Sequence, residues 1–392
     1  MEQYPLTVRK TGLDNAIGMV VLILMAAGAV MTFSASANLK MELNLQNWYQ
    51  YRHLIFFPLA AVVMYLVSLV PYRCLALRKG WLKSPTCYLF AFSMLLLVIT
   101  LIPGFGTEVN YARRWLRVPA GPVTISFQPS ELAKWSMVLL LAAVCDIFND
   151  SLGLFWKRFI PLCGIVALTA GLIVVEDFGT AAFVSLLGFL IMFIAGVRWW
   201  HLLTPVPFAV GVFGLAIVTS PSRIARIGAF LQPEKFAASA GYQAQQSLIA
   251  LASGGLWGKG LGYGISKYGH LPEDTTDFIF AIIGEELGFC GTAAVILLFA
   301  AFAWLGFIVV ARCEDRFGQL LAIGIVLTIA IQAAINIGVV TVVLPTKGIP
   351  LPFISAGGTS LLLSSAAVGV LMNIARQGTG GQVNEVDGKI QG

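Results

Sequence analysis

The chain has 392 residues, of which 58% are hydrophobic and only 11% are charged, with a formal net charge of +6. A soluble domain of this size could not expose so much apolar surface to water, so the composition indicates a protein of the lipid bilayer. The Lys and Arg residues are scattered through short segments between apolar runs, and they form no basic stripe of the kind that binds nucleic acid.

Apolar runs predict ten membrane-spanning helices, because each span needs about 20 apolar residues. In chain order they cover residues 16–33, 54–70, 88–102, 132–148, 159–175, 180–197, 202–219, 278–310, 319–344 and 355–372. The sequence therefore predicts an all-α, polytopic membrane protein. We expect one ten-helix domain over residues 16–376, between an N-terminal segment (1–15) and a polar, disordered tail (377–392).

Basic residues concentrate in the connections that fall on one side when the ten spans are threaded in order. By the positive-inside rule this side is cytoplasmic, and both ends of the chain are expected there. The residues are Arg9, Lys10, Arg73, Arg78, Lys79, Lys83, Lys157, Arg158, Arg198, Arg312, Arg316 and Arg376.

The opposite, extracytoplasmic side receives the three longer loops, which cover residues 34–53, 103–131 and 220–277. The last is too long for a simple connection, so we expect function there. Within it, residues 243–251 predict a short amphipathic helix, and a glycine-rich stretch that follows is expected to be flexible. Together they suit a re-entrant or interfacial element.

Asp277 ends this long loop, where the apolar run of the next span begins. An ionisable group at the edge of a span is a candidate functional residue. A carboxylate at the start of a helix also complements the helix dipole without any role in chemistry. The residues alone leave both interpretations open.

Glu131 and Lys134 lie three residues apart at the head of the fourth span, so they share one helix face and can form an ion pair. The pair could be structural, or it could orient a substrate at the edge of a cavity. Glu285 and Glu286 lie about two helical turns below Asp277, and we interpret them as part of a structural network.

Arg113, Arg114 and Arg117 are expected on the extracytoplasmic side, against the positive-inside tendency. Guanidinium groups bind pyrophosphate oxygens well, and they are also attracted to lipid headgroups. Both explanations remain open.

The three histidines (His53, His201 and His270) lie far apart and show no metal-ligand spacing, and the sequence contains no nucleotide-binding loop. The chemistry of this protein must therefore use a substrate that is already activated.

A series of sequence blocks resembles the FtsW/RodA family (shape, elongation, division and sporulation proteins), and the blocks follow the family's order across nearly the whole membrane region. They are 113–116 (RRWL), 127–134 (FQPSELAK), 242–248 (YQAQQSL), 254–262 (GGLWGKGLG), 271–273 (LPE), 276–280 (TDFIF), 284–288 (GEELG), 336–338 (NIG), 345–348 (PTKG) and 351–358 (LPFISAGG). The PTKG and RRWL blocks look more like the division branch, FtsW, than the elongation branch, RodA.

The sequence departs from the family pattern at a few positions. Thr275 stands where a histidine is common, Ala356 stands where a tyrosine is common, and residues 175–177 (VED) stand where the family more often has Gln-Pro-Asp. These departures concern the fine contacts with substrate and not the fold.

The resemblance implies a bacterial inner-membrane glycosyltransferase that joins lipid II units into glycan strands, with undecaprenyl pyrophosphate as the leaving group. The family's catalytic carboxylate maps onto Asp277, which becomes the candidate general base. The candidate substrate-binding residues are Arg113, Arg114, Glu131, Lys134, Gln243, Ser247, Lys347 and Ser355, and the cations Arg223 and Arg226 could also stabilise the leaving group.

No cofactor is certain, although a divalent cation such as Mg²⁺ or Mn²⁺ could share the stabilisation of the pyrophosphate. The implied partners are lipid II, a class B penicillin-binding protein, other division proteins and membrane lipids. The alternatives are a lipid II flippase, a scaffold that recruits a transpeptidase, and an elongation polymerase of the RodA type.

Overall fold

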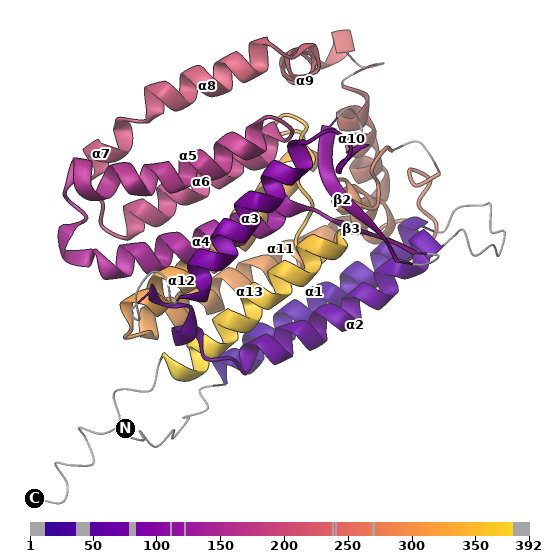
Figure 1. Cartoon of the computed structure of the whole chain (residues 1–392). Coiled ribbons are helices and arrows are strands. Elements are labelled where there is room, and N and C mark those ends of the chain that lie inside the picture. The colour runs from indigo at the N-terminus through magenta and orange to yellow at the C-terminus, as the bar shows by residue number, and fades with distance from the viewer. Residues whose placement is uncertain are drawn as a thin grey trace, which may run out of the picture.

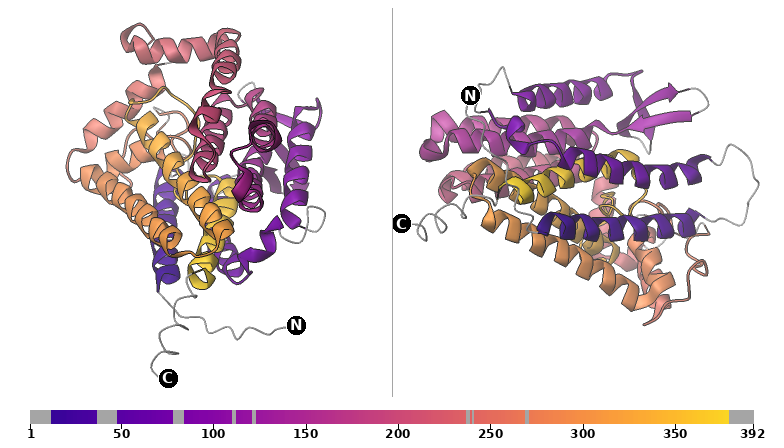
Figure 2. Two further views of the ribbon diagram at one scale, coloured as in Figure 1. Left: turned by 90° about the vertical axis from the view of Figure 1, so that its left-hand side faces the viewer. Right: turned by 90° about the horizontal axis from the view of Figure 1, so that it is seen from below.

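The computed structural model describes residues 12–36, 48–77, 84–109, 112–120, 123–236, 239, 241–268 and 271–378. They form a bundle of long helices that run roughly along one direction (Figure 1). Strands β2 and β3 and helix α10 gather at one end of the bundle, and the start of α1 and the end of α13 lie at the other (Figure 2). Asp277 lies at the first of these, which we call the Asp277 end.

Each of the ten predicted spans coincides with helical structure. The helices are α1 Leu13–Ser36, α2 Trp48–Ser68, α3 Pro85–Leu101, α4 Pro129–Ile147, α5 Ile160–Val174, α6 Phe178–Ile194, α7 Trp199–Leu203, α8 Val206–Val218, α11 Ile279–Arg312, α12 Arg316–Val340 and α13 Gly358–Gln377. The seventh predicted span is divided into α7 and α8 because Pro205 and Pro207 interrupt it.

The length and apolar character of these helices confirm a multi-pass, all-helical membrane protein. Within the described residues, six helical segments are long and apolar enough to cross a bilayer, and three shorter apolar helices accompany them. Helix α8 lies at the edge of the bundle and none of its residues is buried by protein (Figure 1). Its apolar side chains therefore face the lipid.

Polar contacts join α1, α2 and α13 at the end opposite Asp277. Arg376 near the end of α13 pairs with Asp14 in the first turn of α1. Asn373 accepts a hydrogen bond from the Tyr72 N–H at 2.9 Å and donates one to the Ser68 carbonyl at 2.8 Å. The first and last described helices thus begin and end at the same end of the bundle.

A small antiparallel sheet covers part of the Asp277 end, in the segment 103–131 that we expected to be a loop. Its strands are β1 Gly106–Val109, β2 Ala112–Ala120 and β3 Val123–Phe127, in the order β1-β2-β3. The sheet contacts α3 and α4, and the Thr359 hydroxyl of α13 donates to the Ser126 carbonyl at 3.3 Å. The sheet is an addition to an otherwise helical protein.

The long connection between α8 and α11 contains α9 Pro221–Leu231, a short 3₁₀ turn Pro233–Phe236 and α10 Tyr242–Gly254. The predicted helix at 243–251 is confirmed by α10. Helix α9 was not predicted, although its sequence places basic and apolar residues on different faces.

Helix α11 is broken at Gly288, whose backbone has φ 66° and ψ −162°. The Glu285 and Glu286 carbonyls accept hydrogen bonds from the N–H groups of residues 259 and 260, both at 3.0 Å. The N–H groups of Phe289 and Cys290 donate in turn to the carbonyls of residues 255 and 256, at 2.9 and 3.1 Å. The glycine-rich segment therefore satisfies the backbone groups that the break would leave unpaired within the membrane.

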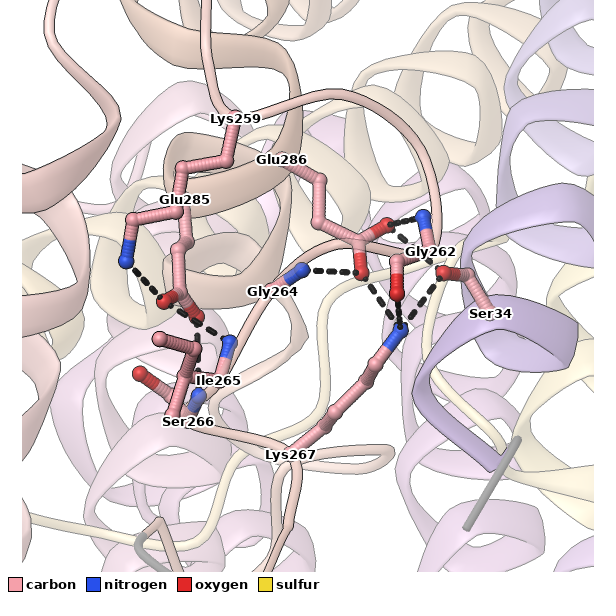
Figure 3. A network of polar contacts seen from close by, with 9 residues as sticks. All are labelled: Ser34, Lys259, Gly262, Gly264, Ile265, Ser266, Lys267, Glu285 and Glu286. Atoms are coloured by element: carbon pink, nitrogen blue, oxygen red, sulfur yellow. Dashed lines mark hydrogen bonds and ion pairs between the residues drawn. The ribbon is translucent and has the colours of Figure 1, made fainter. Parts of the chain in front are cut away.

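The two glutamate side chains bind the same segment (Figure 3). The Glu285 carboxylate accepts from the N–H groups of Ile265 (3.0 Å) and Ser266 (3.1 Å) and from the Lys259 ammonium (2.6 Å). Each carboxylate oxygen is a strong acceptor, so Glu285 ties the backbone of residues 265 and 266 and the Lys259 side chain to α11.

The Glu286 carboxylate is fully buried and accepts from the N–H groups of Gly262 (3.1 Å) and Gly264 (3.3 Å). It also pairs with Lys267 at 2.8 Å and accepts from the Ser34 hydroxyl of α1 at 2.6 Å (Figure 3). The predicted structural network of the two glutamates is confirmed. Our expectation that the glycine-rich stretch is flexible was wrong, because these carboxylates fix its backbone to α11.

Candidate functional site

Asp277 lies directly before α11, and its backbone is held by the loop that joins α12 to α13. The three consecutive carbonyls of residues 275–277 accept hydrogen bonds from the Ala356 N–H (2.9 Å), the Ser355 hydroxyl (2.5 Å) and the Asn336 amide (2.8 Å), respectively. Three anchors on three successive residues leave the Asp277 backbone little freedom to move. The point from which the Asp277 side chain projects is therefore fixed.

Asn336 and Ser355 also hold the α12–α13 loop itself. The Asn336 amide donates a second hydrogen bond to the Ile349 carbonyl at 2.8 Å, and the Ser355 hydroxyl accepts from the Leu351 N–H, also at 2.8 Å. Asp277 and this loop are thus one rigid unit. Ser355, a predicted substrate-binding residue, is buried and acts in the structure as a backbone clamp.

Gly348 of the same loop lies directly against the Asp277 carboxylate. A Cβ atom added at Gly348 would lie 2.6 Å from Asp277 Oδ2, which is closer than van der Waals contact allows. Only a glycine leaves the carboxylate in its present position.

The Asp277 side chain is half-buried and faces charges of both signs. Burial raises the pKa of this carboxyl to about 7, and the carboxylates of Glu273 and Asp177 act in the same direction. The guanidinium groups of Arg114 and Arg226 act in the opposite direction. A carboxyl with this pKa is poised to accept and release a proton near neutral pH.

Arg114 reaches this site from strand β2. Its Nη1 lies 3.5 Å from Asp177 Oδ2, and its Nε donates to the Glu176 carbonyl at 3.0 Å. Asp177 also caps α6 by accepting from the Thr180 N–H at 3.1 Å. The backbone N–H of Arg113 donates to Glu176 Oε2 at 2.7 Å. Both predicted arginines therefore contact the turn between α5 and α6.

Further cations reach the same region from α9 and from the α12–α13 loop. Arg223 donates to the Ala216 carbonyl at 2.8 Å, and its guanidinium lies 5.4 Å from the centre of the Phe178 ring. The Lys347 ammonium lies 4.4 Å from the centre of the same ring. Phe178 thus brings together two cations that are far apart in the sequence.

A small cleft opens beside Arg114, between the apolar sides of α3 and α5 and the polar turn that follows α5. Its lining residues are Leu97, Thr100, Leu101, Arg113, Arg114, Ser130, Leu172, Ile173, Glu176 and Asp177. Its residues from α3 and α5 are mainly apolar, and its residues from β2 and the α5–α6 turn are charged.

Glu131 and Lys134 form the predicted ion pair, with 2.8 Å between Lys134 Nζ and Glu131 Oε2. Lys134 also donates to Gln332 Oε1 at 2.9 Å, and the Gln332 amide donates to the Pro350 carbonyl at 2.9 Å. Glu131 is 5% and Lys134 1% exposed, so the pair does not reach the surface of the site. Through Gln332 the pair supports the α12–α13 loop.

Gln243 and Ser247 lie on α10. Ser247 is fully buried and donates to the Val340 carbonyl at the end of α12, at 2.8 Å. It therefore fastens α10 to α12. Gln243 is half-buried in the first turn of α10.

No cluster of three or more His, Cys, Asp or Glu side chains suited to a metal ion occurs in the part of the chain that the structure describes. His53 and His270 lie outside the residues whose side chains are described.

A comparison with protein families gives one match over almost the whole chain. The family model FTSW_RODA_SPOVE, described as "Cell cycle protein", matches residues 14–380. The chain belongs to the FtsW/RodA/SpoVE family.

Curated members of the FtsW/RodA/SpoVE family resemble the chain along nearly their whole length. The "Stage V sporulation protein E" of Bacillus subtilis (strain 168) is 37% identical over 379 residues, which cover 95% of this chain and 99% of that protein. A "Probable peptidoglycan glycosyltransferase FtsW" of Coxiella burnetii (strain RSA 493 / Nine Mile phase I) is 37% identical over 367 residues, covering 92% and 96%.

Solved structures share the family fold. The crystal structure of the Thermus thermophilus rod shape determining protein RodA matches with a TM-score of 0.63 and 25% identity, covering 95% of this chain and 98% of that chain. A chain in "Structural coordination of polymerization and crosslinking by a peptidoglycan synthase complex" matches with a TM-score of 0.68 and 23% identity, covering 95% and 98%.

Three residues of this FtsW/RodA/SpoVE protein escaped the sequence interpretation of the site. Gln332 and Asn336 are polar residues within an apolar span, and this contrast was the signal that could have identified them. Asp177 was noted only as part of a departure from the family pattern. Its position between two apolar runs was a further signal.

Proposed function

We propose that this protein is a peptidoglycan glycosyltransferase that polymerises lipid II, with Asp277 as its general base. The names of the FtsW relatives support the enzyme class. The observation that carries the proposal is the Asp277 carboxyl, which projects from a backbone held by three hydrogen bonds and has a pKa of about 7 among several cations.

In the proposed reaction Asp277 accepts the proton of the acceptor sugar hydroxyl. The hydroxyl oxygen then forms a bond to the anomeric carbon of the donor sugar, and the bond from that carbon to the pyrophosphate oxygen breaks. Undecaprenyl pyrophosphate leaves with the bonding electrons. The raised pKa of Asp277 suits this role, since a base is most effective when its pKa lies near the working pH.

The leaving pyrophosphate gains negative charge, which requires fixed positive groups. Arg114 and Arg226 lie close enough to Asp277 to influence its pKa, and Arg223 and Lys347 meet at Phe178 nearby. We assign stabilisation of the leaving group to these four cations. Arg113 lines the adjacent cleft and belongs to the same positive region.

The lipid-facing α8 is a suitable surface for the prenyl chains of the substrates. The positive-inside pattern supports an extracytoplasmic position for the Asp277 end and cytoplasmic chain ends. Lipid II would then be polymerised where the wall is built.

We assign the protein to cell division, as the PTKG and RRWL blocks suggested, with a transpeptidase as its partner. Relatives named FtsW support the division role, and the relative named for stage V sporulation keeps a sporulation role as the competing assignment. The fold shared with a peptidoglycan synthase complex is compatible with a transpeptidase partner.

Reconstitution of the purified protein with lipid II tests the enzyme class. The proposal expects glycan polymer from the wild type and none from Asp277→Asn. Transfer of lipid II across the bilayer without polymer would instead identify a flippase, and the absence of both activities, alone and with a transpeptidase, would leave a scaffold.

A further inference from the structure

Arg114 occupies a β-bulge in strand β2. Thr107 pairs with Trp115 and Glu108 pairs with Arg113, so Arg114 is the extra residue on its strand. A bulge bends a strand and turns the side chain of the extra residue away from the regular alternation. This bend directs the Arg114 guanidinium towards the turn between α5 and α6, where it meets Asp177 at 3.5 Å.

The Glu176 carboxylate holds the strand at this bulge. Its Oε2 accepts the Arg113 backbone N–H at 2.7 Å, a short distance that is typical of a hydrogen bond to a charged acceptor. The Glu176 carbonyl accepts from Arg114 Nε at 3.0 Å. The Glu176 side chain therefore holds the backbone of β2 at Arg113, and the Glu176 backbone carbonyl holds the side chain of the next residue, Arg114.

The turn that carries Glu176 is itself rigid. The N–H groups of Glu176 and Asp177 both donate to the Ile173 carbonyl, at 3.1 and 2.8 Å, and Asp177 caps α6 through the Thr180 N–H. Strand β2 is therefore held to the helix bundle through the α5–α6 turn.

We propose that Glu176 is a positioning residue, which fastens strand β2 to the α5–α6 turn so that Arg114 stays beside Asp177 and near Asp277. This inference rests on the proposed function, because Arg114 has a role only if Asp277 and the leaving group need its charge. Glu176 acts through Arg114 and does not touch the reacting atoms.

If the Glu176 carboxylate no longer holds β2 and Arg114 moves away, the pKa of Asp277 should change in a direction that can be measured. The charged groups that face Asp277 are the carboxylates of Glu273 and Asp177 and the guanidiniums of Arg114 and Arg226. Arg114 lowers the pKa of Asp277, so its departure raises that pKa further. The base is then protonated over a wider pH range, and the acidic limb of the rate profile moves to higher pH.

The test compares the initial rates of lipid II polymerisation by Glu176→Ala, Glu176→Asp and Glu176→Gln from pH 5.5 to 9. Alanine lacks the carboxylate that accepts from the Arg113 N–H, and aspartate is one methylene too short to reach it. The pH–rate profiles of both variants should therefore move to higher pH, with a rate at pH 6 about tenfold below the wild type. The glutamine keeps an acceptor oxygen and should retain the wild-type profile.

The exposed Asp150, in the turn after α4 at the opposite end of the bundle, supplies the control, and Asp150→Ala should behave as the wild type. If the role of Glu176 were its charge alone, loss of that charge would lower the pKa of Asp277, and the alanine and glutamine profiles would both move to lower pH. That outcome, or an unchanged profile in both Glu176→Ala and Glu176→Asp, would overturn the inference. A wild type without polymerase activity would instead reject the proposed function.

Discussion

The backbone of Gly348 presses against the carboxylate of Asp277, and a Cβ atom at position 348 would lie 2.6 Å from Oδ2. This contact joins the PTKG block to the TDFIF block, which lie about 70 residues apart in the sequence. The close contact with the candidate base explains why position 348 of the PTKG block is a glycine.

Gly348→Ala should therefore impair catalysis much more than folding. The added methyl group meets the free end of a side chain, which can turn away at little energetic cost, but the carboxylate then leaves its position. A displacement of about 1 Å can reduce a rate by roughly 10²-fold. Polymerisation by the purified variant should fall to that extent while its thermal unfolding temperature changes little.

Gly357→Ala in the same loop is the matched control, because its Cβ would meet only the Ser360 Cβ at an ordinary 3.6 Å. Equal activity of the two variants would show that close packing at Asp277 does not matter.

The rate of polymerisation should depend on pH through Asp277. Only the deprotonated carboxylate accepts a proton, and burial, with Glu273 and Asp177 nearby, raises the pKa of this group to about 7. The initial rate should therefore rise between pH 6 and pH 8 and fall towards acid. A rate that is constant over this range, or that increases towards acid, would contradict a general base with this pKa.

Glu131→Ala should destabilise the protein strongly, because it leaves Lys134 charged and buried without its carboxylate. Removal of one partner of a buried pair typically costs about 3–5 kcal/mol. Thermal unfolding in detergent should show a clear loss, compared with Asp150→Ala at an exposed position. Exchange of the two charges in a double variant should recover part of it. A stable Glu131→Ala protein would mean that the α12–α13 loop does not depend on this pair.

Gly288→Ala should prevent correct folding. The backbone at this position has φ 66° and ψ −162°, a region that is open almost only to glycine, and a Cβ would lie 2.3 Å from the Gly258 backbone nitrogen. Yield and monodispersity in detergent measure the effect. Gly164→Ala in α5 is the control, since its Cβ would meet no atom within 4 Å. Equal yields of the two variants would argue against the rigid break of α11.

The sequence predicted the parts of this structure that depend on local pattern. The apolar helices follow from runs of apolar residues, α10 follows from its periodicity, and the Glu131–Lys134 pair follows from a spacing of three. Local pattern alone left two interpretations of Asp277 open, a carboxylate that complements the helix dipole and a catalytic base. The resemblance to known proteins favoured the base.

The parts that were missed depend on contacts between distant segments. The β-sheet at 106–127 is short and rich in arginine, so it lacked a clear alternation of apolar and polar residues. The glycines after α10 predicted a flexible backbone. Glu285 and Glu286, about 25 residues further along, accept hydrogen bonds from that backbone and hold it in place. The hydrogen bonds of the Ser247 and Ser355 hydroxyl groups to carbonyls of neighbouring elements could not be read from the sequence either.

The measurement that tests the central proposal most directly is lipid II polymerisation by purified Asp277→Asn, with Glu273→Gln and Asp274→Asn as neighbouring controls. Asparagine keeps the size of the side chain but cannot act as the base, so polymerisation should fall by about 10²–10⁴-fold while expression and lipid II binding stay normal. Both controls should remain active. A nearly normal rate in Asp277→Asn together with an inactive Glu273→Gln or Asp274→Asn would place the base on another carboxylate, and activity in all three would contradict general-base catalysis from this loop.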